Sequence, residues 1–156
     1  MSGARASARA AALALALAAP LLAGCATPSW ICLDPPGPST VTIVATPDAN
    51  DNSAVAVDLL FLSDKVAAQQ LVGLSAADFF ANRMQYERDF GNGMREVHWE
   101  LAPGQIVRNA PTHPACGRVA TLLFARYASP GAHRQALRGH DQIVITLGPQ
   151  DFSVSP

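Results

Sequence analysis

The chain has 156 residues, 49% of them hydrophobic and 15% charged, and its formal net charge is −1. A chain of this length has room for one domain with a core of ordinary size. Without a basic excess, the composition excludes charge-driven binding to nucleic acid or to an anionic lipid surface.

The first 24 residues have the pattern of a secretory signal peptide. Residues 10–24 read AAALALALAAPLLAG and carry no charge, and the start before them contributes only Arg5 and Arg9. This run is short for a permanent transmembrane helix, but its basic start, apolar centre and small-residue end are typical of a cleaved signal. We therefore exclude residues 1–24 from the fold. Nine basic residues then remain against twelve acidic ones, a net charge near −3.

The signal ends in LLAGC, residues 21–25, which resembles the bacterial lipobox. In a lipobox the cysteine sulfur takes a diacylglycerol group, and the chain is then cleaved before that cysteine. Several acyl chains hold a protein on a membrane durably, since each buried methylene contributes about 0.8 kcal/mol. We predict a covalent lipid on Cys25. Ala26 and Thr27 follow instead of an acidic residue, which favours the periplasmic face of the outer membrane. Ordinary cleavage near residues 18–20 is the weaker alternative.

Residues 25–38 are predicted to be the lipidated N-terminus and a tether. The stretch DPPGPS, residues 34–39, contains three prolines and a glycine, which favour an extended chain. In an oxidising compartment Cys32 and Cys116 are expected to form a disulfide. The alternative is that His113 and Cys116 form half of a metal site. Because two ligands do not make a tetrahedral shell, no metal site is predicted.

Residues 39–156 are predicted to form the folded domain, which begins with two strands. Residues 40–46 are rich in β-branched side chains, and residues 54–62 alternate so that one face carries Val55, Val57, Leu59 and Phe61. The segment between them, PDANDNS, has turn-forming residues at nearly every position. We expect a β-hairpin with an exposed polar tip.

A helical insertion is expected over residues 63–90. Ser63 is the expected N-cap of a first helix, and Gly73 is its expected end. Ser75 and Asp78 have the spacing of a capping box for a second helix. The apolar positions of this second helix are predicted to lie in the core: Phe79, Phe80, Met84 and Phe90.

The period of two returns after the helices. Residues 97–101 place Val97, Trp99 and Leu101 on one face, while Glu96, His98 and Glu100 are expected on a solvated face. Residues 117–128 are apolar on both faces and are predicted to form a central strand. Residues 142–148 and 151–155 are two further expected strands. The fold class predicted is mainly β, a two-layer β-sandwich of Greek-key kind with a small helical insertion.

The chain contains no motif of a known catalytic site. G-x-S-x-G, H-E-x-x-H, a P-loop and paired C-x-x-C are all absent from the sequence. We therefore predict no catalytic residues, no cofactor and no small-molecule substrate. A small hydrolase that uses Cys116 with His113 remains an alternative.

The order of several segments resembles the TssJ (VasD) family, the outer-membrane lipoproteins of type VI secretion. After the lipobox come ATPDANDNSAVAVDLLFLSD, then ADFF, then LAPGQ, and then FARYASPGAHRQAL before a closing strand. In the first segment PDAN matches the family's loop, and Val55 and Val57 match its second strand. The likeness covers most of the mature chain.

The resemblance implies a fold, a location and a partner. The implied fold is a transthyretin-like β-sandwich, held at the outer membrane by lipid. Such proteins receive the periplasmic region of the inner-membrane protein TssM, mainly through the first loop, which here comprises Pro47, Asp48, Ala49, Asn50, Asp51, Asn52 and Ser53. The alternative from another class is a periplasmic inhibitor or ligand-binding lipoprotein that grips an enzyme or a glycan.

Overall fold

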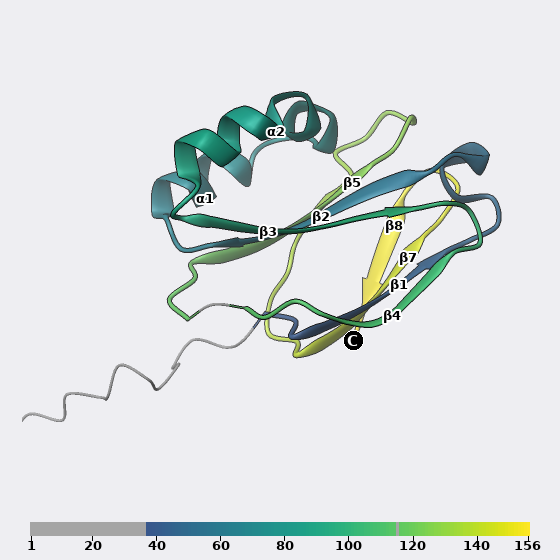
Figure 1. Cartoon of the computed structure of the whole chain (residues 1–156). Helices are drawn as coiled ribbons and strands as arrows, with labels where there is room; N and C mark the ends of the chain where they lie inside the picture. The colour runs from purple at the N-terminus through teal and green to yellow at the C-terminus, as the bar shows by residue number, and fades with distance from the viewer. Residues whose placement is uncertain (1–36, 115) are drawn as a thin grey trace, which may run out of the picture. The chain divides into compact units, whose positions relative to one another are not determined.

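Two β-sheets stacked on one another, with two helices over one of them, make up the domain in the computed structural model (Figure 1). The structure describes residues 37–114 and 116–156. The predicted signal peptide, Cys25, Cys32 and most of the tether lie outside these residues. The predicted class, mainly β with two layers and a helical insertion, is confirmed.

Sheet A has the strand order β4-β1-β7-β8. Its members are β1 (Thr40–Ala45), β4 (Ile106–Pro111), β7 (Gln142–Leu147) and β8 (Phe152–Ser155). Strands β1 and β7 run parallel, and the other two pairs are antiparallel. The expected strands at 40–46, 142–148 and 151–155 are therefore present, whereas β4 was not predicted.

Sheet B has the order β3-β2-β5-β6, and its pairs are all antiparallel. It consists of β2 (Val55–Leu62), β3 (Met94–Leu101), β5 (Ala120–Arg126) and β6 (Arg134–Ala136). Strand β5 lies between β2 and β6, which confirms the predicted central strand. The three-residue strand β6 was not predicted.

The expected hairpin between the first two strands is wrong. Strand β1 belongs to sheet A and β2 to sheet B, so the connection at residues 46–54 crosses from one sheet to the other. The β1 ladders are occupied by β4 and by β7, with Val41 opposite Ala110 and Ile143. Turn residues make the chain reverse direction, but they do not determine which strands it then pairs with.

The main core lies between the two sheets. Alternate residues of β1 and β7 face alternate residues of β2, as the period of two requires. These inward side chains are almost fully buried: Val41, Ile43, Val55, Val57, Leu59, Phe61, Ile143, Ile145 and Leu147.

A second core lies between sheet B and the helices α1 (Lys65–Leu71) and α2 (Ala76–Phe90). The Phe79 ring of α2 stacks on Phe124 of β5 with 4.4 Å between ring centroids. This covering layer explains why the middle strands of sheet B are apolar on both faces. Phe79 is in the core as predicted, whereas Met84 was predicted wrongly, because its side chain is 69% exposed.

The helix starts follow their capping residues. Helix α1 begins one residue later than expected, since Asp64 rather than Ser63 accepts the amide hydrogens of Val66 (2.6 Å) and Ala67 (2.9 Å). Ser75 caps α2 by accepting the Asp78 amide at 3.1 Å, as predicted.

The chain enters the sandwich at the end opposite residues 46–54. At this entrance, which we call the tether end, Thr112 donates its hydroxyl to the Pro38 carbonyl and its amide to Ser39. Cys116, in the connection that follows β4, is disulfide-bonded. Its pairing with Cys32 stays a prediction. Across residues 37–114 and 116–156, neither helix is long and apolar enough to cross a bilayer.

Candidate functional site

The loop predicted to contact a partner forms a tight turn, η1 (Ala49–Asn52). Three consecutive residues have positive φ angles: Asn50 at 47°, Asp51 at 51° and Asn52 at 64°. This left-handed conformation is costly for most residues, and Asn and Asp tolerate it best. The turn residues therefore specify a particular backbone shape at the end of β1.

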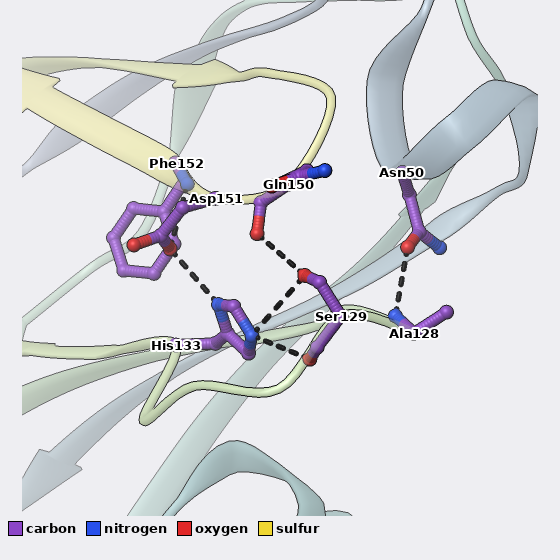
Figure 2. A network of polar contacts seen from close by, with 7 residues as sticks. All are labelled: Asn50, Ala128, Ser129, His133, Gln150, Asp151 and Phe152. Atoms are coloured by element: carbon purple, nitrogen blue, oxygen red, sulfur yellow. Dashed lines mark hydrogen bonds and ion pairs between the residues drawn. The ribbon is translucent and has the colours of Figure 1, made fainter.

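Asn50 anchors this turn to the sandwich. Its side chain is buried, donates to the Ala54 carbonyl at 3.0 Å and accepts the Ala128 amide at 2.8 Å (Figure 2). The Asn50 amide donates to Gly148 at 3.1 Å, and the Asp51 amide donates to Pro149 at the same distance. The expectation that the whole tip is exposed is thus wrong for two residues, Ala49 and Asn50. The others, Pro47, Asp48, Asp51, Asn52 and Ser53, are exposed as expected.

Asn50→Ala is expected to lower the free energy of unfolding by about 2 kcal/mol. The change leaves a buried amide and a carbonyl unpaired and puts alanine at positive φ. Asn50→Gly loses the same hydrogen bonds but accepts the backbone angle, so it should cost less. Urea denaturation of both variants measures the difference. Equal losses would mean that the backbone angle contributes nothing.

Three loops meet at this end of the sandwich, which we call the loop end (Figure 2). They are residues 46–54, residues 127–133 after β5, and residues 148–151 after β7. His133 joins the last two: its Nδ1 lies 3.0 Å from Asp151 Oδ1, and its Nε2 lies 2.9 Å from the Ser129 carbonyl. The ring of Tyr127 packs on His133, and burial raises the pKa of the Tyr127 hydroxyl well above its usual range, with nearby Asp151 adding to the effect.

Ser129, His133 and Asp151 resemble the order of a hydrolase triad but are not arranged as one. The Ser129 hydroxyl is 3.5 Å from His133 Nε2, and it donates to the Gln150 carbonyl at 2.6 Å. Its proton is therefore directed away from the imidazole, whose Nε2 already faces a closer carbonyl oxygen. The geometry is that of a tie between loops and not of an activated nucleophile. The sequence analysis missed this network because Asp151 is distant in the chain.

A hollow of about 380 Å³ lies next to η1 on the outer face of sheet B. Ala56 of β2 lies between Glu100 of β3 and Arg126 of β5, since the strand registers place it opposite both. The small side chain of Ala56 between two long charged ones leaves this space open. Asn50 and Ala54 also line it, so the hollow continues from the turn.

A charged cluster lies where α2 covers sheet B. The Asp58 carboxylate is fully buried, with Arg83 Nε at 3.2 Å from its Oδ2 and His98 Nδ1 bonded to its Oδ1. Arg83 also bonds to Glu96. The expectation of a solvated face is wrong for Glu96, whose side chain is only 11% exposed because Arg83 of α2 reaches over it. It is confirmed for His98 and Glu100, which are exposed, although His98 also contacts Asp58.

Asp58, Glu96 and His98 have ligand atoms within 4.8 Å of one another, and their donor types suit a divalent cation. The guanidinium of Arg83 already lies against both carboxylates and supplies the positive charge there. Burial raises the pKa of Glu96, and the hydrogen bond from Arg83 partly offsets that rise. We therefore assign these residues a structural role as an ion-paired cluster.

The cysteine predictions have different outcomes. Cys116 is disulfide-bonded, so it cannot provide the free thiolate that a hydrolase dyad with His113 requires. Cys25 and Cys32 lie outside the described residues.

The fold, two four-stranded sheets with a helical cover over one of them, matches that of solved TssJ-type lipoproteins. The chain is similar to the type VI secretion lipoprotein TssJ1 from Pseudomonas aeruginosa, with a TM-score of 0.58 and 20% identity over 78% of this chain and 96% of that one. It is also similar to Lip of Serratia marcescens, a membrane-bound component of the type VI secretion system. For Lip the TM-score is 0.57 and the identity 15%, over 78% of this chain and 98% of that one.

A third similar chain comes from the structure of the TssM C-terminal domain from EAEC. Its TM-score is 0.55 and its identity 16%, over 75% of this chain and 96% of that one. Searches against family models and against curated proteins gave no match.

Proposed function

We propose that this protein is a non-enzymatic lipoprotein of a type VI secretion membrane complex. It is anchored at the periplasmic face of the outer membrane through lipid on Cys25. Its loop end docks the periplasmic region of an inner-membrane component of the TssM kind. The observation that carries the proposal is the fold match, which spans almost the whole of a type VI secretion lipoprotein.

The placement of the two ends supports this role. The folded domain begins at the tether end, and β1 leads from there directly to η1 at the loop end. A lipid before the tether would therefore attach the domain through its tether end and leave the opposite end, the loop end, free of the attachment point. Exposed groups on a turn that is already fixed can bind a partner with little further loss of entropy.

Cys25→Ser is expected to move the protein almost completely out of the outer-membrane fraction, since the lipobox then has no thiol to take the lipid. Fractionation of cell envelopes, followed by mass spectrometry of the N-terminal peptide, measures this. Cys32→Ser is the matched control and should leave the protein on the membrane. A wild-type protein with an unmodified residue 25, or a Cys25→Ser variant that still occurs in the outer-membrane fraction, would contradict the anchor.

The docking role is tested by pull-down from detergent-solubilised envelopes of the native bacterium. The proposal expects a TssM-type protein among the specifically captured proteins, identified by mass spectrometry. Capture of a periplasmic enzyme or a glycan in its place would favour the inhibitor or ligand-binding alternative.

A further inference from the structure

The imidazole of His133 is held between two hydrogen-bond acceptors. One is Asp151 Oδ1 at 3.0 Å from Nδ1, and the other is the Ser129 carbonyl oxygen at 2.9 Å from Nε2. A carbonyl oxygen cannot donate, and Asp151 Oδ1 also accepts the Phe152 amide at 2.8 Å. Neutral imidazole carries one N–H, whereas the imidazolium carries two. Only the imidazolium satisfies both contacts at once.

The surroundings of His133 fit an imidazole ring closely. The side chain is 6% exposed, and the Tyr127 ring lies on it with 4.9 Å between centroids. Gly131 covers the ring with its backbone, since a Cβ at that position would lie 2.7 Å from His133 Nε2. The charged or titratable groups that face the ring are Asp151, from the connection after β7, and Tyr127, at the end of β5. Asp151 is the anion that balances an imidazolium here.

The two acceptors belong to the two loops on which η1 rests. Ser129 follows Ala128, whose amide donates to the Asn50 side chain at 2.8 Å. Asp151 closes the connection in which Gly148 and Pro149 accept the amides of Asn50 and Asp51. The contacts that hold these two loops together therefore also hold η1 in place.

We propose that doubly protonated His133 is the positioning group of the loop end, and that a partner protein docks there only while His133 carries both protons. Loss of one proton leaves a lone pair facing an acceptor oxygen, so one of the two contacts must break. The tie between the two loops is then weakened and rests on the Ser129 hydroxyl, which donates to the Gln150 carbonyl at 2.6 Å. The docking part of this inference rests on the proposed function, whereas the clamp itself does not. The ordered arrangement is therefore favoured at low pH and lost as the pH rises.

The clamp is tested by NMR on the mature, 15N-labelled lipoprotein in detergent micelles. The nitrogen shifts of His133 should report two protonated nitrogens at low pH. As one of the two protons leaves, the protection factors of the Asp51 and Ala128 amides, which compare each exchange rate with that of an unstructured peptide at the same pH, should fall at least tenfold with the same midpoint. Asp151→Asn, which keeps the shape and removes the anion, should move that midpoint to lower pH. His140→Gln, an exposed histidine outside the loop end, is the control and should change nothing.

Two results would overturn the clamp. One is a single protonated nitrogen on His133 throughout the range in which the amides are protected. The other is amide protection that does not follow the His133 titration. The docking part is read from capture of the TssM-type periplasmic region over the same pH range, which should fall with the His133 transition. Capture that is constant across that transition overturns it. Absence of capture at every pH, with the NMR coupling intact, contradicts the proposed function and supports the clamp.

Discussion

Replacing Arg83 by methionine is expected to lower the free energy of unfolding by about 3 kcal/mol at neutral pH. Methionine keeps the packing of the arginine stem but leaves the buried Asp58 carboxylate and the largely buried Glu96 without their cation. Breaking a buried pair by removing one partner typically costs about 3–5 kcal/mol. The lower end applies because the Arg83 side chain is 31% exposed. Urea denaturation measures the loss.

The double variant Arg83→Met/Asp58→Asn is the matched control for the charge argument. Because it removes the stranded carboxylate, it should regain part of the lost stability. If the double variant is as unstable as Arg83→Met, or less stable, the lost free energy of unfolding comes from packing and not from charge.

The stability lost in Arg83→Met should also depend on pH. Burial raises the pKa of Glu96, and without Arg83 the contribution that lowers this pKa disappears. The folded variant then holds a proton on Glu96 at pH values where the unfolded chain has released it. The variant's stability therefore falls as the pH rises through this window above the ordinary carboxyl range. Its deficit against the wild type should be small in acid and complete at neutral pH.

The second large effect is expected at the turn. Asp48→Lys combined with Asp51→Asn should weaken binding of the TssM-type periplasmic region at least tenfold, which corresponds to about 1.4 kcal/mol. Both side chains are exposed, and asparagine tolerates the positive φ at residue 51. The change therefore alters the charge of the tip and leaves its shape intact. Isothermal calorimetry with the purified periplasmic region measures the binding constant.

Asp141→Lys provides the control for this turn variant. Asp141 is an exposed carboxylate at the tether end, where its backbone carbonyl accepts the Ser39 amide. A charge reversal there should leave binding unchanged. Thermal midpoints of both variants close to that of the wild type would show that the fold is retained. Equal weakening by both variants would mean that net charge, and not the turn, governs the interaction.

The elements of this fold were predictable where the side-chain period is strong. Alternation in β2 and a run of apolar residues in β5 placed both strands correctly. Strand β4 was missed because it is a mostly exposed edge strand, with Asn109 at positive φ. The partner of β1 could not be read from local sequence, because β7 lies about a hundred residues further along the chain.

The candidate site was predictable only in part, for a similar reason. The turn residues between β1 and β2 indicated a loop, whereas the role in partner contact that the resemblance implies for it stays a prediction. That Asn50 points inward depends on Ala128, 78 residues away. The link between Asp58 and His98 exists because the β2–β3 register places them opposite each other, and Arg83 of α2 lies against Asp58. Neither the inward direction of Asn50 nor the contact between Asp58 and His98 can be predicted from spacing along the sequence.

The route of β1 has a mechanical consequence for the proposed role. A pull between a lipid before Thr40 and a partner held beyond Ala45 would load this single strand along its length. The hydrogen bonds to β4 on one side and to β7 on the other run across that direction. The force therefore acts on all of these bonds at the same time, in shear. A hairpin attached at its open end would instead unzip one bond at a time. The crossing connection that the sequence did not predict thus places the strongest arrangement of strands on the line of tension.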